Sequence, residues 1–264
     1  MDFTNVNARG LVLLGCGKMG SAMLAGWLAD GLSPAAVHVI DPAPSDWLQS
    51  QGVALNGPLP PSPAIAIIAV KPQMMGQALP QLQSLENTLL LSIAAGTSIA
   101  AFEQHFPGAA IVRAMPNTPA AIGQGISAMV GNAATTADDL DLAEGILRAV
   151  GEVVRLDAED QIDAVTGLSG SGPAYVFHLI EAMAAAGVAQ GLDADLALKL
   201  ATHTVAGAGA LAIASDEGPA QLRINVTSPN GTTQAGLEVL MPELPELIAR
   251  TVAAATSRSK ELKG

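Results

Sequence analysis

The chain has 264 residues, of which 50% are hydrophobic and 14% are charged, and its formal net charge is −12. This length is enough for one or two domains with a full hydrophobic core. The acidic balance argues against a partner bound by neutralising phosphate backbones, so we expect no nucleic acid to bind. Residues 1–5 lack the pattern of a signal peptide, and no uninterrupted apolar run reaches the roughly 20 residues of a membrane span. We therefore expect a cytoplasmic protein without a membrane partner.

The chain contains a single cysteine, Cys16, which lies between two glycines. One cysteine excludes both a disulfide within the chain and a zinc site built on cysteines, and we expect no metal. A small residue tolerated in a loop explains Cys16 better than a reactive thiol does.

The segment from Leu11 to Gly20 has the order of a strand, a glycine turn and a helix. Four apolar residues lead into Gly15, Gly17 and Gly20, and an Ala-rich helical pattern follows. Glycines at this spacing permit a tight turn, a close approach to a pyrophosphate and close packing of helix on strand. The segment predicts a dinucleotide site, although a lone G-x-G-x-x-G also occurs in ordinary tight turns.

A second predicted strand, residues 37–40, ends in Asp41, about 20 residues past the last glycine. A carboxylate at this position accepts hydrogen bonds from the adenosine ribose and repels a 2′-phosphate, which favours NADH. No lysine or arginine lies between Lys18 and Lys71, so this segment offers no cation to such a phosphate. Alternatively, Asp41 only opens the turn that follows it.

Residues 64–70, 89–95 and 110–113 continue the pattern of apolar strands separated by helical stretches. The loops after parallel strands line a cofactor crevice, so residues 69–72 are expected to border the dinucleotide. Asn56 lies in a Gly/Pro-rich connection, where it contacts adenosine or serves as a turn residue.

Two prolines, Pro116 and Pro119, follow the strand at 110–113 and fix the loop that contains Met115 and Asn117. A polar side chain in a rigid loop suits a contact with the nicotinamide carboxamide. A plain rigid connection explains the same residues almost as well.

The strand pattern stops near residue 157, after two more predicted strands at 126–130 and 152–156. We therefore predict a doubly wound α/β domain over residues 1–157 and an all-α domain over residues 158–264. The predicted helices of the second domain span residues 159–168, 173–190, 193–215, 232–241 and 244–260. Their many alanines and leucines favour a core completed by dimerisation.

Ser228-Pro-Asn-Gly231 predicts a turn, and Thr232 and Thr233 then open a helix. Backbone N–H groups at a helix start, together with two hydroxyls, form a pocket for a small carboxylate without lysine or arginine. Ordinary capping of the helix by Ser or Thr explains the same residues.

Together these segments resemble the pyrroline-5-carboxylate reductases, which perform the last step of proline synthesis, and the resemblance spans essentially the whole chain. The segments that carry it are residues 15–20, 69–72, 92–96, 113–119, 170–175 and 226–237. The Ser-Pro-x-Gly-x-Thr pattern within the last segment is the most specific of these.

The resemblance implies reduction of 1-pyrroline-5-carboxylate to L-proline by hydride from NADPH or NADH. It implies an N-terminal Rossmann-type sheet followed by an all-α dimerisation domain, with active sites shared in a homodimer that often assembles into a larger ring. Many relatives favour NADPH, whereas Asp41 favours NADH. Both cofactors stay open, with a slight weight on NADPH from the relatives.

By matching position, the substrate carboxylate and ring are assigned to Ser228, Gly231, Thr232 and Thr233. Thr233 is the main catalytic candidate, because its hydroxyl can reach the ring nitrogen. The nucleotide is assigned to Gly15, Cys16, Gly17, Lys18, Met19, Gly20, Asn56, Ala69, Val70, Lys71, Pro72, Ala94 and Asn225, to which the sequence pattern adds Asp41, Met115 and Asn117.

Two alternatives remain at this point. A β-hydroxyacid dehydrogenase-like enzyme resembles this arrangement but carries a catalytic lysine on the helix that corresponds to residues 173–190, which contain none. A protein that senses nucleotides without turnover would not need the pocket at residues 228–233.

Overall fold

The computed structural model describes residues 3–262, which form two compact units. The first unit contains the residues up to Gly170 and those from Ala255 onward, and the second contains Ser171–Ala254. This division lies later than the boundary expected at residue 157, because helix α7 (Gln161–Val165) packs on the sheet of the first unit through the buried Ile162.

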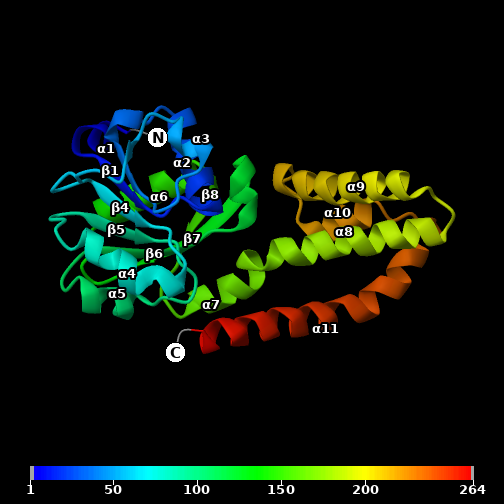
Figure 1. Ribbon diagram of the computed structural model, residues 1–264. Helices are drawn as coiled ribbons and strands as arrows, with labels where there is room; N and C mark the ends of the chain where they lie inside the picture. The colour runs from blue at the N-terminus through cyan, green and yellow to red at the C-terminus, as the bar shows by residue number, and fades with distance from the viewer. Residues whose placement is uncertain (1–2, 263–264) are drawn as a thin grey trace. The chain divides into compact units, whose positions relative to one another are not determined.

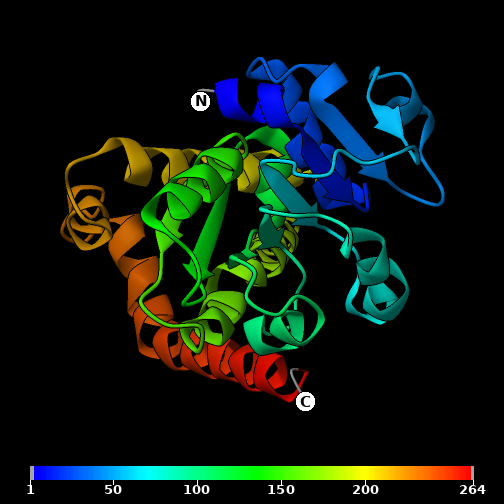
Figure 2. The same ribbon diagram turned by 90° about the vertical axis from the view of Figure 1, so that its left-hand side faces the viewer.

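The first unit is built on one eight-stranded sheet with the order β3-β2-β1-β4-β5-β6-β7-β8. In Figure 2 the sheet runs from blue strands at one edge to green strands at the other. The chain moves outward in opposite directions from β1 and β4, so the strand order reverses between these two neighbours. The strands are β1 (Leu11–Leu14), β2 (Val37–Ile40), β3 (Ala54–Leu55), β4 (Ile65–Ile68), β5 (Leu89–Ser92), β6 (Ile111–Met115), β7 (Gly125–Gly131) and β8 (Gly151–Arg155).

Helices cover both faces of this sheet, as Figure 1 shows. One face packs on α1 (Thr4–Arg9), α2 (Lys18–Ala29), α3 (Asp46–Gln49) and α6 (Ala137–Arg148). The other face packs on α4 (Met75–Ala78), the 3-10 turn η3 (Leu79–Leu82), α5 (Ile99–His105) and α7. Burial on both faces explains why β1 and β4 are unbroken apolar runs and why β5 is apolar up to Ser92. The predicted Rossmann-type α/β fold is confirmed.

The sequence pattern missed α1, the two-residue β3 and the direction of β7, which pairs antiparallel with β6 while the other neighbouring strands are parallel. Residues 116–124, which join β6 to β7, contain only the 3-10 turn η4 (Thr118–Ile122). A parallel crossover needs about a dozen residues or more, so this connection can only return the chain antiparallel.

The second unit consists of helices α8 (Gly172–Ala189), α9 (Ala194–Ala214), α10 (Pro219–Asn225) and most of α11 (Thr232–Glu261). Two separate helices had been predicted where α11 runs continuously through Pro242 and Pro245. Each proline lacks the N–H that would bond the carbonyl four residues earlier, at Glu238 and Met241, and both of these residues are exposed. The short α10 was also not predicted.

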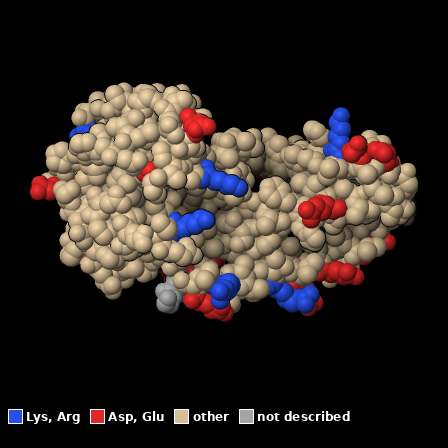
Figure 3. Space-filling view, viewed as in Figure 1, with Lys and Arg blue, Asp and Glu red and all other residues tan. Residues whose placement is uncertain are grey.

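Apolar side chains of the second unit are largely exposed within one chain. Helix α8 buries no residue and α9 buries only Ala197 and Ala201, while Ile213 is 90% exposed. Figure 3 shows that much of the visible surface of this unit carries no charged side chain. The stretches Gln161–Ala189 and Ala194–Ala214 are long and apolar enough to cross a membrane by length and mean hydropathy, although neither is an unbroken apolar run.

An ion pair between the buried Arg113 and the partly exposed Glu159 fixes β6 in the first unit. Arg113 is 2% exposed, and its Nη1 lies 2.5 Å from Oε1 of Glu159, which also accepts the backbone N–H of Ile99 at 2.9 Å. Glu159 thus joins β6, the start of α5 and the segment before α7. Nearby, the Ser259 hydroxyl at the end of α11 donates to Asp163 of α7 at 2.8 Å.

We expect Glu159→Ala to lower the free energy of unfolding by about 2 kcal/mol, because it leaves the Arg113 guanidinium buried without its partner. The cost is lower than for a fully buried pair, because Glu159 is partly exposed to solvent. Urea unfolding at a fixed protein concentration measures the change. The control is Glu152→Ala, at a side chain that is 78% exposed. Equal effects of the two variants would contradict this role for Glu159.

Candidate nucleotide and substrate sites

A cavity of about 520 Å³ lies in the first unit at the carboxyl ends of β1, β2 and β4. It therefore lies where the strand order reverses, which is where open α/β sheets bind ligands. The lining residues that the sequence predicted are Gly15, Gly17, Asp41, Asn56, Ala69, Val70 and Lys71. The lining residues that it missed are Leu14, Ile40, Pro42, Met74, Gln77, Ala78 and Gln81. Gln77 and Gln81 lie four residues apart after Lys71-Pro72, a helical spacing that could have indicated a polar face toward the cavity.

The glycine turn fits a dinucleotide. Gly15 has a φ of +87°, and a Cβ there would lie 2.8 Å from Val70, whereas a Cβ on Gly20 would lie 2.7 Å from the carbonyl oxygen of Gly15. Both contacts exclude a side chain. A Cβ on Gly17 would meet no atom within 4 Å, so the backbone there borders open space. No side chain caps the start of α2, which leaves its first N–H groups available to phosphate oxygens.

Asp41 borders the cavity directly after β2, and hydrogen bonds hold its carboxylate in place. Oδ2 accepts the backbone N–H of Cys16 at 2.7 Å, and Oδ1 accepts that of Ala43 at 2.8 Å. The bond to Cys16 joins the end of β2 to the glycine turn. Asp41 thus shapes the turn as well as facing the space where an adenosine ribose would lie.

Asn56 serves as a turn residue beside Asp41. Its φ of +50° is the left-handed conformation that asparagine tolerates in turns. Its side-chain oxygen accepts the backbone N–H of Asp41 at 2.9 Å, and its side-chain nitrogen donates to the Asp41 carbonyl at 2.8 Å. Asn56 also borders the cavity, so a contact with adenosine stays a prediction.

The other predicted nucleotide residues of the first unit lie outside the cavity lining. Lys18 and Met19 begin α2, Pro72 begins the 3-10 turn η2 (Pro72–Met74), and Ala94 is buried after β5. Asn117 is 9% exposed, with Nδ2 donating to the Ser169 carbonyl at 3.2 Å and Oδ1 accepting the Ile126 N–H at 2.9 Å. The Asn117 amide therefore braces the loop after β6, beside Met115.

In the second unit, residues 228–231 form the predicted turn. The N–H of Gly231 donates to the Ser228 carbonyl at 3.0 Å, and Asn230 has a φ of +58°. The hydroxyls of Ser228, Thr232 and Thr233 make no hydrogen bond within the described residues, and all three side chains are exposed. These hydroxyls do not cap α11, so its N-terminal N–H groups also remain available. Asn225 lies at the end of α10, where its side chain bonds Glu217 and Gln221.

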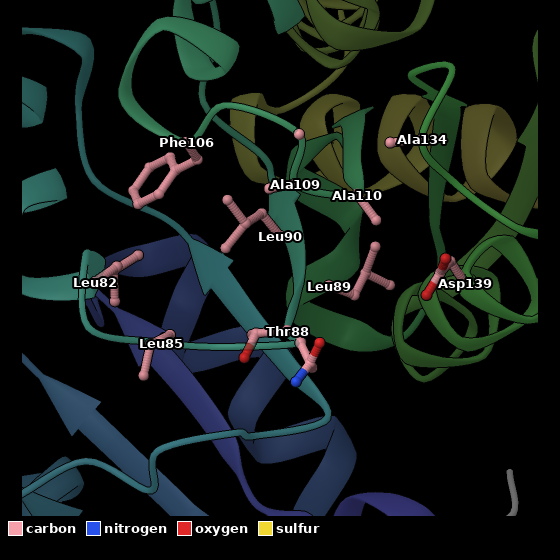
Figure 4. Close-up of a pocket in the computed structure, with 12 residues that line it drawn as sticks. Leu82, Leu85, Thr88, Leu89, Leu90, Phe106, Ala109, Ala110, Ala134 and Asp139 are labelled. Carbon is pink, nitrogen blue, oxygen red and sulfur yellow. The ribbon is translucent and has the colours of Figure 1, made fainter.

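A second hollow, of about 370 Å³, lies at the amino ends of β5 and β6 (Figure 4). Its walls include Thr88 and Leu89, where β5 begins, and Ala110 just before β6. Ligands of such sheets bind at the carboxyl ends of the strands, so this hollow is not the nucleotide site. No group of three or more metal-ligating side chains is found within residues 3–262.

Comparison with known sequences places both units in one family. A sequence model described as NADP oxidoreductase coenzyme F420-dependent matches residues 11–96, and one described as pyrroline-5-carboxylate reductase dimerisation matches residues 159–262. The pyrroline-5-carboxylate reductase of Synechocystis is 42% identical over 261 residues, covering 96% of this chain and 97% of the relative. That of Pseudomonas aeruginosa is 38% identical over 266 residues, covering 96% of each chain.

Solved structures agree with this result. A pyrroline-5-carboxylate reductase from Coxiella burnetii matches with a TM-score of 0.92 and 34% identity, covering 97% of this chain and 99% of that one. A pyrroline carboxylate reductase from Plasmodium falciparum, solved with NADP bound, matches with a TM-score of 0.82 and 29% identity, covering 98% and 99%.

The fold and the cavity define a Rossmann-type, NAD(P)H-dependent oxidoreductase whose helical region matches a dimerisation domain. The chain belongs to the pyrroline-5-carboxylate reductase family, which confirms the resemblance seen in the sequence. The alternative of a β-hydroxyacid dehydrogenase finds no support, and α8 contains no lysine.

Burial raises the pKa of the Cys16 thiol, and the negative charge of Asp41 raises it further, against an opposing hydrogen bond with Ser21. We therefore expect iodoacetamide to label Cys16 at least about 10-fold more slowly than the unfolded chain at pH 7, and the rate to rise as the pH passes 9. Mass spectrometry reads the reaction directly, because the chain has one cysteine. Equal labelling of the folded and unfolded chain at pH 7 would contradict this placement of the thiol.

Proposed function

We propose that this protein reduces 1-pyrroline-5-carboxylate to L-proline with hydride from NADPH or NADH, as the last step of proline biosynthesis in the cytoplasm. The observation that carries the proposal is the turn and helix start at residues 228–233, which present three hydroxyls without a hydrogen bond among the described residues, in a chain that also holds a nucleotide cavity. Family membership supports it, because the relatives in Synechocystis and Pseudomonas aeruginosa bear the name of this activity.

The turn supplies hydrogen-bond donors to which a small carboxylate can bind. The first N–H groups of α11 and the hydroxyls of Ser228 and Thr232 are hydrogen-bond donors, and the positive end of a long helix dipole favours an anion. In this proposal these groups hold the substrate carboxylate, while Gly231 lets the backbone come close to the ring.

The reaction needs little acid–base catalysis from the protein. NADPH or NADH, when bound, supplies the hydride that adds to the imine carbon, and one proton goes to the ring nitrogen to give the secondary amine of proline. A cyclic imine is electrophilic already, so holding its carbon in place and excluding water account for most of the catalysis. Thr233 is proposed to hydrogen-bond the ring nitrogen and so hold the imine in its reactive orientation.

The second unit is proposed to bind a second copy of this chain, and the dimers to assemble further into a ring. The match of residues 159–262 to a dimerisation region supports association, and so do exposed apolar side chains such as Phe177 and Ile213, which are 60% and 90% exposed. A second copy covers the apolar stretches of α8 and α9 in this proposal, so that no membrane is needed.

Loss of nicotinamide absorbance on adding 1-pyrroline-5-carboxylate tests the activity. We expect oxidation of NADPH or NADH with this substrate and no reaction of a 3-hydroxy acid with the oxidised nucleotide. Turnover of the hydroxy acid would favour a β-hydroxyacid dehydrogenase. Nucleotide binding without any turnover would indicate a sensor.

Thr233→Ala is expected to lower kcat by about 10- to 100-fold, the scale of one lost hydrogen-bonding group at a reacting atom. Steady-state kinetics at saturating nucleotide measure the change. The matched control is Thr251→Ala, because Thr251 lies further along the same helix and bonds the Leu247 carbonyl at 2.8 Å. Unchanged kinetics of Thr233→Ala would remove this residue from the mechanism.

Sedimentation equilibrium over a wide range of protein concentration tests the assembly. We expect a mass of two chains or a multiple of two, because a lone second unit leaves its apolar helices in water. A mass of one chain at all concentrations would contradict the proposal.

A further inference from the structure

We propose that Asp41 makes the nucleotide site selective for NADH over NADPH. The proposal rests on the proposed function, in which one of these nucleotides supplies the hydride. The two nucleotides differ only by the 2′-phosphate on the adenosine ribose, so a preference must arise where that ribose lies. In a sheet of this type the ribose lies beside the end of the second strand, where Asp41 follows β2.

The carboxylate of Asp41 is fixed, so it cannot turn aside for a phosphate without losing its bonds. Each oxygen accepts one backbone N–H, from Cys16 at 2.7 Å and from Ala43 at 2.8 Å. Asn56 holds the backbone of Asp41 through its N–H and its carbonyl, at 2.9 and 2.8 Å. Turning the carboxylate away would break both bonds to its oxygens and would release the glycine turn.

The same carboxylate can still accept the hydroxyls of a ribose. A carboxylate has about four acceptor positions, and the two backbone N–H groups occupy two of them. The remaining positions suit the 2′- and 3′-hydroxyls of NADH. A 2′-phosphate offers no such donor when ionised and brings negative charge against the carboxylate.

The cavity provides no cation beside Asp41 to offset that repulsion. Residues 19–70 contain no lysine or arginine, and the neighbours of Asp41 in the lining, Pro42 and Asn56, are uncharged. Lys71 is the one cationic side chain of the lining. It follows β4, and β1 lies between β4 and β2, so that these two strands are about 10 Å apart. Lys71 is therefore placed nearer to the glycine turn and the pyrophosphate than to the ribose.

Direct binding tests the preference without any turnover. Titrations followed by nicotinamide fluorescence give dissociation constants for NADH and NADPH, and we expect NADH to bind at least about 10-fold more tightly. Asp41→Asn should cut this ratio about 10-fold or more, and Asp41→Asn combined with Pro42→Arg should reverse it. Tighter or equal binding of NADPH to the unaltered protein would overturn the proposal. So would an unchanged ratio in Asp41→Asn.

Two controls separate charge at this site from other effects. Asp46→Asn removes one exposed negative charge from the same connection and should leave the ratio unchanged. If Asp41→Asn does not fold, as judged by circular dichroism, Pro42→Arg alone places a cation beside the carboxylate and should lower the preference. A Pro42→Arg protein that keeps the full preference would overturn the proposal.

Comparing kcat/KM for the two nucleotides with 1-pyrroline-5-carboxylate then separates this proposal from the proposed function. Selective binding of NADH without reduction of the imine supports the role of Asp41 and contradicts the function. Reduction of the imine with NADPH at least as efficient as with NADH supports the function and contradicts the role of Asp41.

Discussion

The hydrogen bond from the Cys16 backbone N–H to the Asp41 carboxylate joins two strand ends that the rest of the nucleotide site depends on. The N–H of Gly15 also donates to the Ile40 carbonyl, and the N–H of Ala69 donates to that of Leu14, both at 2.8 Å. These bonds connect the ends of β2, β1 and β4 above a core that is buried on both faces. The residues of one chain thus form the cavity, and Asp41, which is proposed to select the nucleotide, lies in its wall.

The second unit, unlike the first, leaves much of its apolar surface exposed within one chain. Its helices leave large apolar side chains in water, and the turn that is proposed to bind the substrate carboxylate is exposed, with hydroxyls that make no hydrogen bond within the described residues. One chain therefore completes its nucleotide cavity but not its helical region. In the proposed assembly a second copy supplies the missing contacts, so dimerisation and catalysis depend on the same helices.

Much of this arrangement could be predicted from the sequence, because local patterns determine it. The spacing of Gly15, Gly17 and Gly20, the apolar strands and the acid after β2 each follow from short-range chemistry. The direction of β7 depends on the length of one connection, and α11 continues through Pro242 and Pro245, where the general rule for proline predicts a break. The bracing role of Asn117 requires the positions of Ser169 and Ile126, which only the folded chain brings together. The residues of the second unit that are proposed to bind substrate were found by resemblance to a family, since a helix start with Ser and Thr is common in any sequence.

The central claim is that this protein transfers hydride from a nicotinamide to the imine carbon of 1-pyrroline-5-carboxylate. The most direct measurement uses reduced nucleotide in which deuterium replaces both hydrogens on C4 of the nicotinamide. Mass spectrometry then locates the deuterium in the product. We expect L-proline with one deuterium, on the ring carbon that was the imine carbon. Proline without deuterium at that carbon, or no proline at all, would contradict it.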